Sequence, residues 1–174
     1  MPSWPSPKIL MVHAGGIGDL LLSLPAMRAF REAFRDSSLE LLGFPERLSL
    51  IAYDLQAAAL RDINQAGLAP FYLEGEDLPS RLREYFSSFS AALLIGRSRA
   101  ETFAKNLGRA GIQKVVFLPS FPEEGAKLHV TDHLLRALRS FGIMGGNSFV
   151  PLRLSADAQL RAKEYLIKIG LEKG

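Results

Sequence analysis

The stretch Lys8–Phe34 reads KILMVHAGGIGDLLLSLPAMRAFREAF, and it decides the fold. The apolar run Ile9–Val12 predicts a buried strand, Ala14–Asp19 forms a glycine-rich turn, and the residues after the turn predict a helix. This order of elements places backbone N–H groups and the Asp19 carboxylate at the carboxyl end of a parallel sheet. Ligands of open α/β sheets bind at that edge.

The turn departs from the two common phosphate-binding motifs. In the dinucleotide fingerprint G-x-G-x-x-G, a register that begins at Gly16 puts Leu21 at the position of the third glycine. A P-loop ends in Gly-Lys-Ser/Thr, whereas this turn ends in Gly18-Asp19-Leu20 and places a negative charge where nucleotide phosphates would lie. The sequence therefore argues against direct binding of nucleotide phosphates at this turn.

Short apolar runs alternate with helical stretches along the chain. Runs bounded by Gly, Pro or Ser predict covered parallel strands at 8–13, 39–42, 91–95 and 114–118, and 60–63 is a candidate for an additional strand. Apolar residues recur with helical spacing from Leu20 to Phe34 and from Val130 to Phe141. The alternation predicts an α/β fold with a Rossmann-like, open, mainly parallel sheet and helices on both faces.

The stretch from Lys8 to Phe34 resembles the opening of the glycosyltransferase family 9 proteins, whose best-known members are the ADP-heptose:lipopolysaccharide heptosyltransferases. In that family a strand is followed by a small-residue turn that ends in Gly-Asp, an apolar helix start with Leu-Pro-Ala, and an amphipathic continuation. All four parts are present here. The resemblance continues more loosely through Leu39–Gly43 and Lys127–Leu135, so it spans nearly the whole chain.

The resemblance also implies a domain organisation. Proteins of this family have a two-domain GT-B arrangement, in which the first Rossmann-like domain holds the acceptor and the second holds the nucleotide-sugar. The 174 residues of this chain suit one such domain. We therefore expect an acceptor-binding domain over 1–150, ending at the linker-like Met144–Ser148. Residues 151–174 are expected to form a crossover segment and a helix capped by Ser155, leading to a donor-binding domain absent from this chain.

The composition is typical of a globular cytoplasmic domain. With 48% hydrophobic and 22% charged residues, the chain fits neither the disordered nor the fibrous class, and the absence of cysteine excludes disulfides. No basic leader precedes the first apolar run, and Gly15 and Asp19 break that run well short of the ~18 residues of a membrane span. The net charge of +3 favours acidic partners weakly. We expect a cytoplasmic protein, with peripheral contact to the inner membrane surface, and no nucleic-acid partner.

Asp19 has two interpretations. By itself, an aspartate at a helix start favours a cap, because its carboxylate satisfies an N–H group and suits the positive end of the helix dipole. The resemblance implies another role: in the heptosyltransferases the aspartate of this motif is proposed to be the general base that takes the proton from the acceptor hydroxyl. A sugar hydroxyl needs such a base, because it is a poor nucleophile until its proton is leaving. We therefore expect Asp19 to be catalytic in the full enzyme.

Three further residues of the turn region are candidates for acceptor binding. His13 ends the first strand, where the family members usually carry Lys or Arg, and a neutral imidazole would weaken a cationic contact to an acceptor phosphate or carboxylate. A ligand contact and a histidine packed at the strand end both remain open. Gly15 and Gly16 are the other two candidates, although backbone shape is the stronger reason for a glycine at either position.

Basic residues near two other predicted elements extend the candidate site. Arg97 and Arg99 follow the strand that ends near Gly96, so they are expected at the same edge of the sheet. Guanidinium groups match phosphate and carboxylate oxygens, which makes this pair the candidate contact for an anionic acceptor group, with a solvated surface pair as the alternative. Lys127, just before the helix that begins near His129, is a further candidate.

No metal or cofactor is predicted. The spacing of His129 and His133 places two imidazoles on one helix face, but the sequence lacks the glutamate of a zincin motif and an evident third ligand. The resemblance implies that the donor substrate, ADP-heptose or another nucleotide-sugar, is bound by the missing domain.

The function predicted from these observations is that of the N-terminal part of a glycosyltransferase in lipopolysaccharide biosynthesis. The whole enzyme would transfer a heptose or a related sugar to a lipopolysaccharide core or another glycan acceptor, by direct displacement with inversion, and this chain alone would be inactive. A stand-alone, non-catalytic module that binds a glycan or another anion is the alternative. A nucleotide-binding Rossmann protein is a third hypothesis, which the incomplete fingerprint disfavours.

Overall fold

The computed structural model describes residues 7–65, 67–146 and 150–171. Five parallel strands form one sheet in the order β3-β2-β1-β4-β5. Their bounds are β1 (Lys8–His13), β2 (Ser38–Gly43), β3 (Ala57–Asp62), β4 (Phe89–Gly96) and β5 (Lys114–Pro119). The last residue of β1, His13, pairs with Gly43 of β2 and Ile95 of β4, so the central strands end together at one edge of the sheet.

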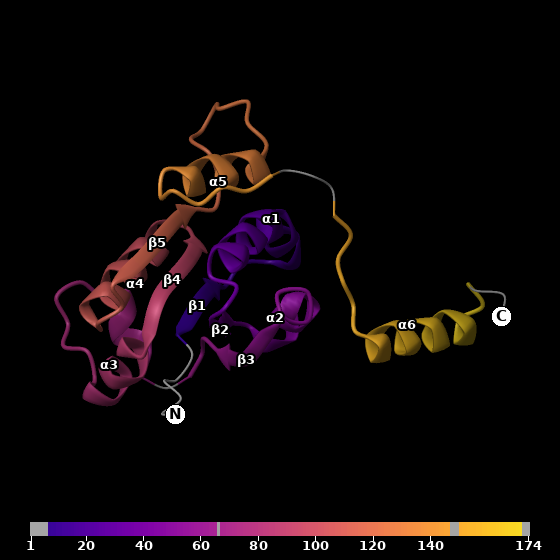
Figure 1. The fold of residues 1–174 in the computed structure, drawn as a ribbon, viewed down its shortest axis with the longest axis horizontal. Coiled ribbons are helices and arrows are strands. Elements are labelled where there is room, and N and C mark those ends of the chain that lie inside the picture. The colour runs from indigo at the N-terminus through magenta and orange to yellow at the C-terminus, as the bar shows by residue number, and fades with distance from the viewer. Residues whose placement is uncertain (1–6, 66, 147–149, 172–174) are drawn as a thin grey trace.

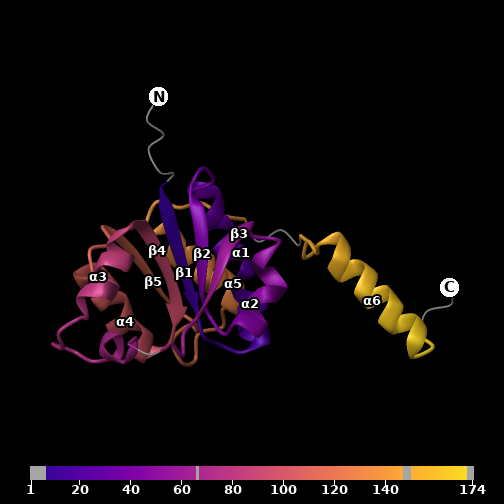
Figure 2. The ribbon, with the colours of Figure 1, turned by 90° about the horizontal axis from the view of Figure 1, so that it is seen from below.

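Helices cover both faces of the sheet (Figures 1 and 2). One face carries α1 (Ile17–Ala33), α2 (Pro45–Ala52) and α5 (Val130–Arg139). The other carries the 3₁₀ helix η1 (Ala69–Tyr72), α3 (Ser80–Ser87) and α4 (Ser98–Arg109). The predicted fold class, an open Rossmann-like α/β sheet, is therefore confirmed.

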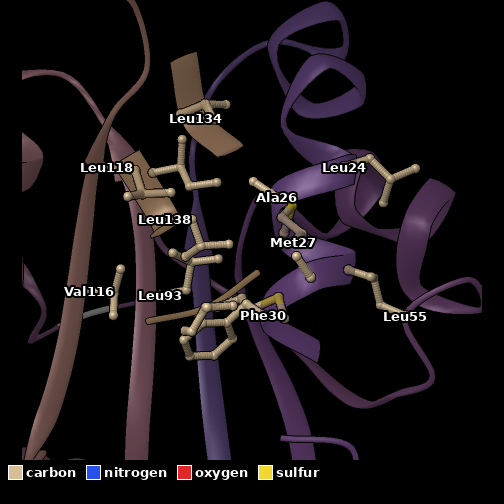
Figure 3. Close-up of a cluster of buried hydrophobic side chains, with 14 of the residues drawn as sticks. Leu24, Ala26, Met27, Phe30, Leu55, Leu93, Val116, Leu118, Leu134 and Leu138 are labelled. Atoms are coloured by element: carbon tan, nitrogen blue, oxygen red, sulfur yellow. The ribbon is translucent and has the colours of Figure 1, made fainter. Parts of the chain in front are cut away.

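A separate apolar core lies on each face of the sheet. Figure 3 shows the larger core, where Met27 and Phe30 of α1 meet Leu93 of β4 and Leu138 of α5. Alternate residues of β1 enter the two cores, because successive side chains of a strand point to opposite faces. Burial of both faces explains why the central strands read as unbroken apolar runs.

Most predicted elements are present, with shifted ends. The four expected strands are confirmed, and the candidate at 60–63 is a real edge strand that begins earlier, at Ala57. The first helix begins at Ile17 rather than Leu20, and Phe141 lies beyond the end of α5. The helices α2 and α4 were not predicted.

A buried carboxylate joins the segment before α6 (Ala156–Lys168) to the sheet domain. The fully buried side chain of Asp54 accepts hydrogen bonds from Arg28 Nε and Nη2, at 2.7 and 2.8 Å, and from the Arg153 backbone N–H at 3.0 Å. Arg28 also donates to the backbone carbonyls of Val150 and Pro151, each at 2.9 Å. We call this Arg28–Asp54–Arg153 cluster the arginine clasp. It holds residues just past the expected boundary at 150 against the first domain.

The helix α6 stands apart from the sheet in Figures 1 and 2, and none of its residues is buried. Ser155 Oγ accepts a hydrogen bond from the Ala158 N–H at 3.2 Å, which confirms Ser155 as its N-cap. Of the linker-like Met144–Ser148, the residues from 147 lie outside the described part of the chain. Within the described ranges, no helix combines the length and the apolar character that crossing a membrane requires.

Candidate functional site

A cavity of about 260 Å³ lies where the chain changes from one face of the sheet to the other. After β1 the chain enters α1 on one face, and after the neighbouring strand β4 it enters α4 on the opposite face. The two connections diverge and leave a crevice at the carboxyl ends of these strands, which is the usual ligand site of open α/β sheets. The cavity is lined by Val12, Ala14, Gly15, Asp19, Ile63, Tyr72, Leu94, Ile95, Gly96, Arg97, Arg99, Ala100, Phe103, Ser120 and Phe121.

The Asp19 carboxylate belongs to this lining but does not cap α1. The N-cap is Gly16, which makes no side-chain hydrogen bond, and Asp19 is the third residue of the helix. The interpretation of Asp19 as the N-cap of this helix is therefore wrong. The helix α1 starts three residues earlier than predicted, which places Asp19 in its first turn. There the negative charge still suits the helix dipole. Across the described residues, no hydrogen bond or ion pair engages the half-buried carboxylate, so it is available to a ligand.

Gly15 is needed for a close approach rather than for an unusual backbone angle. A Cβ atom at this position would lie 2.8 Å from Cε1 of His13 and 3.2 Å from Cβ of Asp19. A side chain here would therefore displace the two neighbours that flank the turn. Gly15 lines the cavity, whereas Gly16 is exposed at the helix start and is not part of the lining.

The structure places His13 beneath the turn, outside the cavity lining. Its imidazole is buried, and Nδ1 accepts a hydrogen bond of 3.3 Å from the Gly15 N–H. Burial lowers the pKa of His13 to about 4, the neighbouring Asp19 carboxylate opposes this shift, and the Arg47 guanidinium adds to it. A neutral ring is what the hydrogen bond needs, because a protonated Nδ1 cannot accept. The predicted contact of His13 with an acceptor stays a prediction.

Arg97 and Arg99 lie in the same cavity as Asp19. Arg97 occupies the N-cap position of α4, and its guanidinium lies over the ring of Phe121, 5.1 Å from the ring centre. Both arginine residues are exposed, so their charged groups reach solvent at the mouth of the cavity. The structure thus brings together a carboxylate from the first turn of α1 and two cations from the start of α4.

The remaining candidates lie outside this cavity. Lys127 is exposed in the segment before α5 and is not part of the lining. His129 caps α5 by accepting from the Thr131 N–H, and Nε2 of His133 lies 3.0 Å from the Pro119 carbonyl oxygen. In the parts of the chain that the structure describes, no group of three or more His, Cys, Asp or Glu residues could hold a metal ion.

Sequence reasoning missed the aromatic residues of the lining, among them Tyr72 and Phe121. Phe121 follows the strand β5, so the rule that located Arg97 could also have found it. Tyr72 comes from η1, inside an irregular connection that carries no signal for the sheet edge. Both rings are partly exposed, which gives the cavity apolar surfaces beside its charged groups.

Among known proteins, the chain is similar to several solved structures. No protein-family model matches it, and neither does any curated protein. A solved structure of a glycosyltransferase family 9 protein from Veillonella parvula DSM 2008 matches with a TM-score of 0.61 and 15% sequence identity, over 97% of this chain and 51% of that one. The two proteins share a fold. This agrees with the open Rossmann-like α/β fold predicted from the sequence.

Heptosyltransferase WaaC from E. coli also matches, with lower scores. Its structure with ADP has a TM-score of 0.46 at 15% identity, and its structure with ADP-2-deoxy-2-fluoro heptose has a TM-score of 0.43 at 16% identity. These matches cover 81% and 87% of this chain and 49% and 53% of WaaC. The chain thus spans about half the length of each of the three matched structures.

Proposed function

We propose that this chain is the acceptor-binding part of a glycosyltransferase, and that the complete enzyme transfers a heptose or a related sugar from a nucleotide diphosphate donor to a lipopolysaccharide core or another glycan. The observation that carries the proposal is the position of the Asp19 carboxylate, in a cavity at the β1–β4 switch point that also holds Arg97 and Arg99. The fold shared with a family 9 protein supports the reaction class.

The proposed chemistry is a single displacement at the anomeric carbon of the donor sugar. Asp19 accepts the proton of the acceptor hydroxyl while the hydroxyl oxygen forms a bond to that carbon. The bond between the carbon and the nucleotide diphosphate breaks, the configuration inverts, and the leaving diphosphate takes up the bonding electrons. A carboxylate that no hydrogen bond or ion pair of the described residues engages is available to receive a proton, because a carboxylate held in an ion pair is a weaker base.

Arg97 and Arg99 are assigned to binding in this proposal. Their guanidinium groups pair with a phosphate or carboxylate of the acceptor, and the aromatic rings of Tyr72 and Phe121 offer flat apolar surfaces beside them. The acceptor is thereby fixed by its charge while its hydroxyl faces Asp19. The donor nucleotide-sugar is assigned to the remainder of the complete protein.

Titration of the 174-residue chain with a phosphorylated fragment of a lipopolysaccharide core tests this assignment. Replacing both Arg97 and Arg99 with Ala is expected to weaken binding about tenfold per lost contact, the low end for charged hydrogen bonds, because both residues are exposed. The loss should shrink at high salt. The control Arg35→Ala removes an exposed arginine that forms an ion pair with Glu32, outside the cavity. Equal affinity of the double variant and this control would contradict the assignment.

A further inference from the structure

The two peptide groups that flank Gly15 are each held by a hydrogen bond with a side chain. The Gly15 N–H donates to Nδ1 of the buried His13 at 3.3 Å, and the Gly15 carbonyl oxygen accepts from Nη1 of Arg47 at 3.0 Å. The first contact comes from the strand before the turn, and the second comes from a helix that follows a different strand. The turn is therefore tied to β1 and to α2 at the same time.

Arg47 is fixed in a position to make this contact. It lies in the first turn of α2, and its guanidinium lies over the ring of Phe44, 4.3 Å from the ring centre. The close approach of β2 to β1 brings this helix start next to the turn, and Gly43 allows it: a Cβ atom there would overlap the backbone oxygen of His13. A guanidinium that is already stacked on a ring loses less freedom when it forms this hydrogen bond.

The backbone of Gly15 packs directly against Asp19. A Cβ built on Gly15 would lie 3.2 Å from Cβ and 3.3 Å from Oδ2 of Asp19, so the main chain of Gly15 forms the surface on which this side chain rests. A shift of the Gly15 backbone would change the space available to the Asp19 carboxylate. Displacements of about 1 Å near a reacting group can lower a rate by two orders of magnitude.

We propose that His13 and Arg47 are positioning residues that act through the backbone of Gly15 to hold the Asp19 carboxylate in the cavity. His13 holds the N–H side and Arg47 the carbonyl side, and neither residue lines the cavity. The catalytic consequence of this arrangement rests on the proposed function, in which Asp19 is the base. The mechanical part, the immobilisation of the turn, does not depend on it.

The mechanical part is tested by ¹⁵N relaxation of the 174-residue chain. A rigid backbone has an order parameter near about 0.85, and a flexible one falls below about 0.6. We expect a fall toward the lower value at Gly15 in Arg47→Met and in His13→Phe. His13→Asn should keep the wild-type value, because the Asn side-chain oxygen can accept the Gly15 N–H in place of Nδ1.

Arg31→Met is the matched control. Arg31 donates to the backbone carbonyls of Leu55, Phe34 and Ser37, all remote in sequence from the turn and outside the cavity lining. The substitution Arg31→Met therefore removes an arginine that binds backbone oxygens without touching Gly15. This variant should leave the Gly15 order parameter unchanged. Unchanged order at Gly15 in both Arg47→Met and His13→Phe would overturn the proposal.

The catalytic part is tested by the kinetics of the complete enzyme. Arg47→Met and His13→Phe should lower kcat by about 10- to 100-fold with little change in the acceptor KM, while His13→Asn and Arg31→Met keep most of the rate. A mobile turn with an unaltered kcat would overturn the claim that the contacts serve Asp19. Absence of sugar transfer by the wild-type enzyme would contradict the proposed function instead, and the relaxation measurement would still decide the mechanical claim.

Discussion

His13 is buried and neutral at the end of β1, and this state makes the stability of the protein depend on pH. The pKa of the imidazole falls from 6.5 to about 4 in the folded chain, mainly because burial disfavours the charged ring. Between these two values the unfolded chain binds a proton that the folded chain does not. Stability is therefore expected to decrease as the pH falls from about 6.5 to about 4, by up to roughly 3 kcal/mol.

This dependence can be measured by urea unfolding between pH 4 and pH 7 for the wild type and for His13→Asn. The variant lacks the titrating ring, so its free energy of unfolding should change less over this range. His133→Asn is the control, because His133 is partly exposed and its Nε2 contacts the Pro119 carbonyl oxygen. Identical slopes for the wild type and His13→Asn would show that His13 does not carry the effect.

At the scale of elements, the arginine clasp is the main link between the sheet domain and the segment that precedes α6. Burial raises the pKa of Asp54, but the hydrogen bonds from Arg28 and Arg153 outweigh it, and the net pKa lies below the usual value. The folded chain thus keeps a charged carboxylate in its interior. Such a charge is tolerated only while its partners remain.

Arg28→Met is expected to lower the free energy of unfolding by about 3 kcal/mol, because it leaves the Asp54 charge buried with the partly exposed Arg153 alone. Thermal or urea unfolding measures this loss, and faster proteolysis near residue 150 should accompany it. Arg161→Met removes an exposed ion pair with Asp157 and should cost less than about 0.5 kcal/mol. Equal losses in the two variants would show that the clasp contributes no more than a surface pair.

The sequence predicted the strands better than the helices. The three central strands β2, β1 and β4 are buried on both faces, and an apolar run between turn residues marks such a strand directly. The edge strand β3 is only partly covered, which weakened its pattern. The helix α2 was missed because it has only eight residues. The helix α4 was missed because many polar residues separate its apolar residues in the sequence.

The residues of the candidate site, too, could be located from the sequence only in part. Asp19, Arg97 and Arg99 could be located because each follows a recognisable strand, and parallel strands end at one edge. Arg47 could not, because its contact with Gly15 depends on how closely β2 approaches β1. The burial of His13 also required the structure, since a histidine at a strand end fits a ligand contact as well as a packed position.

At the scale of the whole molecule, the proposed division of labour makes a prediction about nucleotide binding. The donor is assigned to a part of the complete protein outside this chain, and the β1–α1 turn carries a negative charge instead of a phosphate-binding motif. Calorimetry on the 174-residue chain should therefore detect no binding of ADP. Micromolar binding at a single site would favour the nucleotide-binding hypothesis over the acceptor-binding one.

The role of Asp19 in the complete enzyme can be measured with Asp19→Asn. The substitution keeps the shape of the side chain, and Asp19 caps no helix, so the melting temperature and acceptor affinity should change little. The control Asp36→Asn alters an exposed aspartate outside the cavity and should keep the wild-type rate. Loss of the general base should lower kcat by roughly 10²- to 10⁴-fold in Asp19→Asn. A folded Asp19→Asn enzyme that retains more than about a tenth of the wild-type kcat would contradict the assignment of Asp19 as the base.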